Sequence, residues 1–204
     1  MYTGIIQGMV PVRAITWEES MLHFSLQLPA ELVDGLITGA SVSVNGVCLT
    51  VTETSGCEIS FDAVSETLAI SNLDKLTIGT LVNIERSARY DAEIGGHILS
   101  GHIVGTARIQ AVNKRPGNYR MTFAGDSKWL KYLFLKGFLA INGASLTIAE
   151  LDMEAGIFSV NLIPETLLRT NFSLLEEGDE VNIEVDSQTR VIVDTVERIM
   201  ADRY

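Results

Sequence analysis

Val44-Asn45-Gly46-Val47-Cys48-Leu49-Thr50-Val51 and Ile141-Asn142-Gly143-Ala144-Ser145-Leu146-Thr147-Ile148 are two versions of one stretch of sequence. They lie 142 − 45 = 97 residues apart, close to half of the 204 residues, which indicates an internal duplication. Each copy is typical of a β-hairpin, because Asn-Gly accepts the positive φ angles of a type I′ turn and both flanks are strand-like.

The turn also fixes which side chains share a face of the hairpin. In the first copy Val44 faces Val47 and Ser43 faces Cys48, and side chains alternate between two faces. The face expected in the core holds Val42, Val44, Val47, Leu49 and Val51, and in the second copy Leu139, Ile141, Ala144, Leu146 and Ile148. The opposite face holds Ser41, Ser43, Cys48 and Thr50, and in the second copy Phe138, Ala140, Ser145 and Thr147. The copies share a scaffold and present different chemical groups.

Other landmarks repeat in the same order along the two halves. Gly4 matches Gly101 at the offset of 97, and Glu66-Thr67-Leu68 matches Glu165-Thr166-Leu167 at an offset of 165 − 66 = 99. Near the start, residues 2–15 are expected to form a strand that bends at Gly8.

Each half therefore has about six short strands and two short helices, the pattern of a small closed antiparallel barrel. The predicted fold is all-β, with two tandem homologous six-stranded antiparallel β-barrels followed by a C-terminal α-helix. We expect the barrels at residues 1–88 and 97–186, joined by a polar linker, and the helix at residues 187–204.

The C-terminal segment carries an apolar stripe at helical spacing, formed by Ile192, Val196, Ile199, Met200 and Arg203. Such a stripe more often docks on its own domain. Val191 and Val193 widen it, which suits a contact between subunits.

Composition narrows the class of partner. A formal charge of −11 and a pI near 4.7 argue against nucleic acid, whose binding needs clustered Lys and Arg, so we expect a small ligand or another protein. The sequence shows neither a membrane span nor a signal peptide, which predicts a cytoplasmic location. Cys48 and Cys57 are expected to be free thiols.

Cys48 is the first candidate for chemistry. By itself it fits a buried structural thiol. Its place on the polar face, opposite Ser43, and its repeat partner Ser145 instead favour two matched sites, one with a thiol and one with a hydroxyl.

Two histidines and a lysine are further candidates. His97 and His102 are five residues apart, so on a strand they point to opposite faces and cannot hold one metal ion together. One of them fits a satisfied surface histidine. His102 replaces Ile5 of the first half and is the better candidate for general acid/base catalysis. Lys136 fits a solvated charge equally well. Glu66 and Glu165 fit ordinary helix starts, although the N–H groups there also suit a ligand.

Taken together, these motifs resemble riboflavin synthases over nearly the whole chain. The resemblance is carried by Met1-Tyr2-Thr3-Gly4-Ile5, Asn45-Gly46-Val47-Cys48-Leu49-Thr50, Glu66-Thr67-Leu68, Gly95-Gly96-His97, Ser100-Gly101-His102, Lys136-Gly137, Gly143-Ala144-Ser145-Leu146-Thr147 and Ile163-Pro164-Glu165-Thr166-Leu167. It implies a transferase that dismutates two molecules of 6,7-dimethyl-8-ribityllumazine into riboflavin and 5-amino-6-ribitylaminouracil, the last step of riboflavin biosynthesis, with no cofactor and no metal.

The resemblance also implies an assembly and a set of site residues. The assembly is a homotrimer, held partly by the C-terminal helix, in which the N-terminal barrel of one subunit meets the C-terminal barrel of a neighbour; an association with lumazine synthase stays open. The catalytic residues implied are Ser41, Cys48, His102, Lys136 and Ser145. The substrate-binding residues implied are Gly4, Ile5, Ile6, Cys48, Leu49, Thr50, Asp62, Ala63, Val64, Ser65, Glu66, Thr67, Gly101, His102, Ile103, Lys136, Asn142, Ser145, Leu146, Thr147, Ile163, Pro164, Glu165, Thr166, Leu167 and Leu168.

Two positions depart from the family pattern. Tyr2 stands where Phe is usual, and Asn142 stands where many relatives carry Asp, which matters because an amide cannot titrate. The alternative function is that of lumazine proteins, which have a similar fold. They bind one lumazine or flavin, as antennae or stores, and catalyse no reaction.

Overall fold

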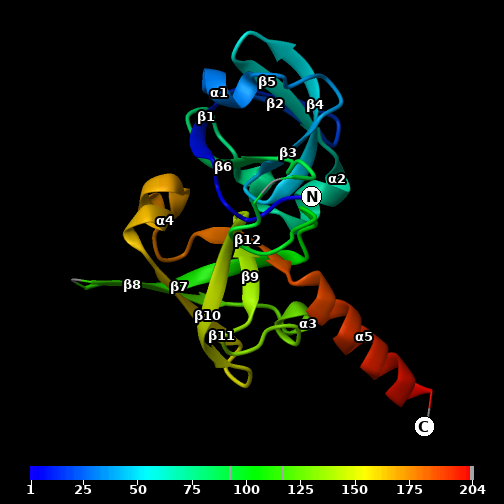
Figure 1. Ribbon diagram of the computed structural model, residues 1–204, viewed down its shortest axis with the longest axis vertical. Helices are drawn as coiled ribbons and strands as arrows, with labels where there is room; N and C mark the ends of the chain where they lie inside the picture. Colours follow the sequence, from blue (N-terminus) through cyan, green and yellow to red (C-terminus); the bar gives the residue numbers. More distant parts are fainter. Residues whose placement is uncertain (92, 116, 203–204) are drawn as a thin grey trace.

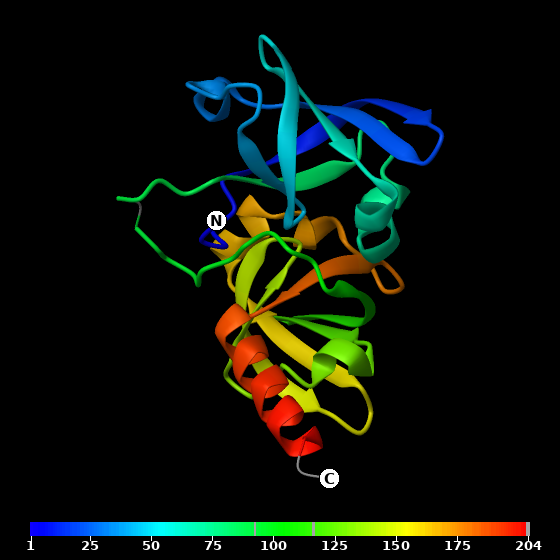
Figure 2. The ribbon, with the colours of Figure 1, turned by 90° about the vertical axis from the view of Figure 1, so that its right-hand side faces the viewer.

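Two closed β-barrels lie one above the other in the computed structural model, and a helix extends from the second (Figures 1 and 2). The structure describes residues 1–91, 93–115 and 117–202. The predicted fold is confirmed, because each barrel closes from six strands, in the orders β1-β2-β5-β4-β3-β6 and β10-β11-β8-β7-β12-β9. Every strand pair within them is antiparallel.

The elements follow the same order in both halves. The first barrel contains β1 (Gly8–Glu18), β2 (Met21–Gln27), α1 (Ala30–Val33), β3 (Ser41–Val44), β4 (Val47–Ser55), β5 (Glu58–Ala63), α2 (Ser65–Ile70), η1 (Asn72–Lys75) and β6 (Leu81–Arg86). The second contains β7 (Gly105–Arg115), β8 (Asn118–Ala124), α3 (Ser127–Leu130), β9 (Phe138–Ile141), β10 (Ala144–Asp152), β11 (Ile157–Leu162), α4 (Pro164–Arg169), η2 (Asn171–Leu174) and β12 (Glu180–Val185), and α5 (Ser187–Ala201) follows it.

The two repeated hairpins have the predicted register. Val44 pairs with Val47 and Ser43 with Cys48 in the first hairpin, and the matching pairs recur in the second. Asn45 and Asn142 have positive φ angles of 46° and 44°, as a type I′ turn requires. The side chains of the predicted core faces are all buried, so each hairpin supplies one wall of a barrel core.

The prediction of a strand that starts at Tyr2 is wrong. Strand β1 begins at Gly8, and its register shifts between Val12 and Ala14 rather than at the glycine. Residues 2–6 instead leave the first barrel and cross to the second, where Ile6 joins the core. Residues 99–103 cross the opposite way, and Ile103 joins the core of the first barrel. We call residues 2–6 and 99–103 the first and second crossing segments.

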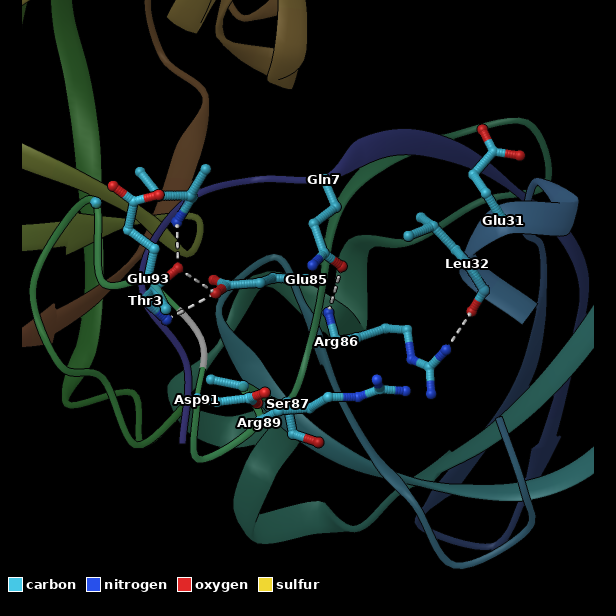
Figure 3. A pocket seen from close by; sticks show the side chains of 13 residues that line it. Thr3, Gln7, Glu31, Leu32, Glu85, Arg86, Ser87, Arg89, Asp91 and Glu93 are labelled. Carbon is cyan, nitrogen blue, oxygen red and sulfur yellow. Dashed lines mark hydrogen bonds between the residues drawn. The ribbon is translucent and has the colours of Figure 1, made fainter. Parts of the chain in front are cut away.

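A buried carboxylate anchors each crossing segment. Glu85 accepts hydrogen bonds from the backbone N–H of Thr3 (2.6 Å) and of Gly4 (3.0 Å), and Figure 3 shows its carboxylate turned toward Thr3. Glu184 holds Ser100 and Gly101 in the same way in the second half. Burial raises the pKa of Glu85, and the donated hydrogen bonds oppose that effect.

The barrels meet at a seam of asparagines. The Asn83 side chain donates to the backbone carbonyl of Asn142 (3.0 Å), and the Asn182 side chain donates to that of Asn45 (2.8 Å). These contacts are related by the sequence repeat, and all four side chains are buried. The seam therefore fixes the two hairpin turns against each other with satisfied polar groups.

Helix α5 does not bury its apolar stripe on its own domain, so the docking expectation is wrong within residues 187–202. Val191, Ile192, Val196, Ile199 and Met200 are at least 49 % exposed, whereas the polar face of α5 contacts the second barrel through Tyr132–Asp194 and Lys131–Glu197. Arg203 lies outside the described residues. Among the described helices, none has the length and apolar character needed to cross a membrane.

Candidate functional site

The crossing segments bring residues of both halves to each repeated hairpin. The N–H of Ser145, at the start of β10, donates to the carbonyl of Gly4, and the N–H of Cys48 on β4 donates to the carbonyl of Gly101, both at 2.9 Å. The two nucleophile-type residues therefore occupy matched positions, each beside a backbone that comes from the other half of the chain.

Glycine is required where these backbones touch. Gly4 and Gly101 have φ angles of 75° and 79°, and a Cβ on either would lie 2.5 Å from the Cβ of Ser145 or of Cys48. Any larger residue would push the crossing segment off the hairpin.

A pocket of about 540 Å³ opens beside Ser145. The first crossing segment, the start of β10 and the helix α4 form its walls. We call it the second-barrel pocket, and its lining residues are Gly4, Ile5, Ile6, Gln7, Ala144, Ser145, Ile163, Glu165, Thr166, Arg169 and Thr170. Its isoleucines offer an apolar wall, while Glu165, Thr166 and Arg169 offer polar groups on α4, where Arg169 Nε donates to Glu165 Oε1 (2.8 Å).

Ser145 has a buried histidine as its partner. Its Oγ lies 2.6 Å from Nδ1 of His97, whose ring stacks on Phe138 with 5.5 Å between centroids. His97 is only 8 % exposed, so a surface histidine is the wrong interpretation for this position. Burial lowers the pKa of His97, partly offset by the charge of Asp186, and the imidazole is therefore neutral at pH 7.

Cys48 has a buried tyrosine as its partner. The phenol of Tyr2 donates to Cys48 Sγ over 3.1 Å. Burial, with a further contribution from this hydrogen bond, raises the pKa of Tyr2 far above its usual range, so the phenol keeps its proton and acts as a donor. Cys48 itself is partly exposed.

The residues predicted for the site around Cys48 divide between that site and other places. Gly101 contacts Cys48, and His102 is exposed next to it. Ile103, Leu49 and Ala63 are buried in the barrel core. At the start of α2, Val64, Ser65 and Glu66 are exposed and Thr67 is partly buried. These residues at the start of α2 correspond, through the sequence repeat, to the residues at the start of α4 that line the second-barrel pocket.

Asp62 points elsewhere. Its carboxylate lies 2.7 Å from Nδ1 of His23, at a separate hollow of about 420 Å³ lined by residues of β1, β2, β4 and β5. The structure therefore does not bring its side chain to Cys48.

The residues predicted for the site around Ser145 are also divided. Gly4, Ile5, Ile6, Ser145, Ile163, Glu165 and Thr166 line the second-barrel pocket, whereas Pro164, Leu167 and Leu168 belong to α4 without lining it. Leu146 is buried in the core. Lys136 and Thr147 are exposed around the second hairpin, as is Thr50 beside the partly exposed Ser41 in the first. Asn142 is fully buried in the asparagine seam, where its Oδ1 accepts from the N–H of Asn182 (2.8 Å).

Some residues at the site escaped sequence reasoning. Arg169 and Thr170 follow Glu165 and Thr166 by four residues, and this helical spacing could have placed them on the same face. His97 was considered as a candidate but not assigned to the site; at the repeat offset of 97 it has no counterpart in the first half, so the repeat gave no signal for its position. In the part of the chain that the structure describes, no three side chains are grouped to hold a metal ion.

Comparison with known proteins agrees with this architecture. The model of the lumazine binding domain matches residues 3–87 and again residues 100–186. Over 204 residues the chain is 46 % identical to the riboflavin synthase of Escherichia coli K12, covering all of this chain and 95 % of that protein. The chain belongs to the riboflavin synthase family.

Further members and solved structures extend the likeness. The riboflavin synthase of Chlamydia pneumoniae is 42 % identical over 201 residues, 98 % of each chain. The crystal structure of LumP complexed with riboflavin superimposes with a TM-score of 0.84 at 25 % identity, over 92 % of this chain and 100 % of LumP. The crystal structure of LumP complexed with 6,7-dimethyl-8-(1'-D-ribityl) lumazine superimposes with a TM-score of 0.81 at 25 % identity, over 91 % of this chain and 99 % of LumP. Membership of the riboflavin synthase family confirms the resemblance drawn from the sequence.

Proposed function

We propose that the chain acts as a riboflavin synthase, a transferase that moves a four-carbon unit between two molecules of 6,7-dimethyl-8-ribityllumazine and releases riboflavin and 5-amino-6-ribitylaminouracil. The observation that carries this proposal is the similarity to riboflavin synthases over the full length of the chain. The two matched sites in one chain support it, because a dismutation needs two copies of one substrate held in unlike surroundings.

The second-barrel pocket suits one lumazine. Its volume of about 540 Å³ is in the range of small-molecule sites. Ile5, Ile6 and Ile163 would contact the flat ring, and Glu165 and Thr166 would hydrogen-bond the ribityl hydroxyls. The repeat-related place beside Cys48, with Gly101 and the start of α2, would receive the second lumazine.

The chemistry proposed needs proton transfer by side chains of the protein, without a cofactor or a metal. One lumazine loses a proton from its C7 methyl group, and the resulting carbanion adds to the second lumazine. Ser145, Cys48 and His102 are the residues we propose to hydrogen-bond the reacting rings or exchange protons with them. Ser41 and Lys136, beside the two hairpins, would assist.

We propose that the two ring sites face each other between subunits of a homotrimer. Ile5 (48 % exposed) and Ile163 (64 % exposed) leave apolar surface at the rim of the second-barrel pocket, which a neighbouring N-terminal barrel would cover. The exposed stripe of α5 would bind its counterparts in the same assembly. A cytoplasmic location, expected from the sequence, and an association with lumazine synthase, left open by the family resemblance, remain predictions.

The test is to incubate the purified protein with 6,7-dimethyl-8-ribityllumazine alone and to follow both compounds by absorbance and chromatography. Riboflavin should form at half the rate of lumazine loss without added metal or nucleotide. Lumazine binding without conversion would contradict the enzyme and favour the antenna or storage function of lumazine proteins. The number of ligands bound at equilibrium also distinguishes the two functions, because two per chain are expected for the enzyme and one for the antenna.

A further inference from the structure

We propose that His97 is a positioning residue that donates a hydrogen bond to Ser145 and so directs the hydroxyl proton of Ser145 into the second-barrel pocket. This inference rests on the proposed function, because it assigns a way of working to Ser145 in that reaction. It concerns a residue outside the repeat, contributed by the linker between the barrels.

The contact is built closely. His97 Nδ1 and Ser145 Oγ are 2.6 Å apart, and the ring is held by Phe138 on its face. The preceding residue, Gly96, lets the linker come this near, since a Cβ there would lie 2.7 Å from the Cβ of Ser145 and 2.3 Å from the carbonyl oxygen of Thr3. A side chain at position 96 would therefore move His97 away from Ser145.

The direction of the hydrogen bond follows from the other ring nitrogen. Nε2 of His97 is buried without a hydrogen-bond partner among the described residues. A buried N–H without an acceptor is costly and rare, and a bare ring nitrogen is the better tolerated state. The neutral imidazole therefore carries its proton on Nδ1 and donates it to Ser145 Oγ.

A serine that already accepts one hydrogen bond offers its own O–H to a ligand. Ser145 lines the second-barrel pocket, and its backbone is fixed by the hydrogen bond to Gly4. Donation from a fixed hydroxyl to a ring nitrogen or oxygen would stabilise negative charge that develops on the lumazine during reaction. Cys48, held by Tyr2 rather than by an imidazole, offers a different group at the matched position.

Two substitutions separate positioning from packing. His97→Phe keeps a ring on Phe138 and loses Nδ1, whereas His97→Asn loses the ring and places an amide nitrogen near the position of Nδ1. If His97 positions Ser145, the Phe variant loses about tenfold in kcat with a smaller change in KM, the effect of one hydrogen bond, and the Asn variant regains most of it. A packing role predicts the reverse order, with Phe tolerated and Asn damaging, and would overturn the inference.

A double-mutant cycle with Ser145→Ala completes the test. His97→Phe should have little further effect on kcat once Ser145 is Ala, because the group through which it acts is gone. Additive losses would overturn the inference. If the Phe variant fails to fold, the same cycle with His97→Leu, which also removes Nδ1, decides. Should the wild-type protein make no riboflavin, the proposed function itself fails; should only the predicted ranking of variants fail, the function stands and this inference falls.

Discussion

Tyr2 places a phenol hydroxyl beside Cys48 in the first site. It is 2 % exposed and donates to Cys48 Sγ over 3.1 Å. A donated hydrogen bond stabilises negative charge on sulfur, and the thiolate is the reactive form of cysteine. We therefore expect the buried Tyr2 to raise the reactivity of Cys48.

Tyr2→Phe should slow the alkylation of Cys48 by iodoacetamide about three- to tenfold, since roughly one hydrogen bond to the thiolate is lost. Mass spectrometry of the two cysteine peptides measures this, and Cys57 serves as the internal control with an unchanged rate. Faster alkylation of Cys48 in the variant would mean that the phenol shields the sulfur instead of activating it.

His97 should make the stability of the fold depend on pH. Burial lowers its pKa in the folded state below the ordinary value of 6.5, with Asp186 as the opposing charge. Below pH 6.5 the unfolded chain therefore binds more protons than the folded chain, and this contribution to stability is lost as the pH falls. At pH 7 and above both states carry a neutral imidazole, and the contribution is complete.

His97→Asn removes this titration. The free energy of unfolding in denaturant should be higher for the wild type at pH 7, and the difference between the two proteins should shrink at pH 6 and again at pH 5. A difference that stays constant or widens on acidification would show that His97 is not held neutral by its surroundings.

The hairpins show how far local sequence determines an element. Asn-Gly between alternating apolar residues was enough to predict register and the buried face of both copies, because the turn geometry is fixed by two residues. Ser43 departs from the predicted polar face, since it is buried, near Gly143 in the asparagine seam. That contact belongs to the packing of two barrels and has no local signal.

The turns themselves limit how closely the barrels can approach. Gly143 has a φ of 82°, and a Cβ on it would lie 2.9 Å from the backbone nitrogen of Gly46. Gly39 has a similar φ of 88°, but no described atom lies within 4 Å of the place its Cβ would occupy. Both positions have a left-handed backbone, but only a Cβ at position 143 would collide with neighbouring atoms.

Gly39→Ala should therefore cost about 1–2 kcal/mol of unfolding free energy, the strain of a left-handed alanine. Gly143→Ala should cost at least about 2 kcal/mol more, because the new methyl group would collide with the backbone of Gly46, which the seam holds in place. Urea unfolding of both variants beside the wild type makes the comparison. Equal losses would show that the turns separate at little cost.

For the whole molecule, the repeat predicted two barrels but not their exchange of segments. Residues 2–6 are apolar enough to continue β1, so local pattern favoured a strand there. The path of this segment is decided by hydrogen bonds to residues far along the chain. Glu85 accepts from the N–H groups of Thr3 and Gly4, and the N–H of Ser145 donates to the carbonyl of Gly4. Asn142 was grouped with the binding residues by family resemblance, and its side chain lies in the seam, where Oδ1 accepts from the N–H of Asn182.

The exposed stripe of α5 leads to a prediction about assembly. The polar face of α5 is already engaged with Lys131 and Tyr132, so the stripe centred on Ile192, Val196 and Ile199 is free to bind other copies of the chain. An apolar helix face of this extent is stable in water only when it is covered.

Val196→Glu places a charge in the middle of this stripe and should convert the proposed trimer into monomers, as measured by sedimentation at micromolar concentration. Ala201→Glu makes the same change in charge on the opposite side of the helix and should leave the trimer intact. If the two ring sites meet between subunits, the Val196 variant should still bind lumazine but lose riboflavin formation, and the Ala201 variant should keep both. A wild-type protein that sediments as a monomer with full activity would contradict the shared site and require both lumazines to react within one chain.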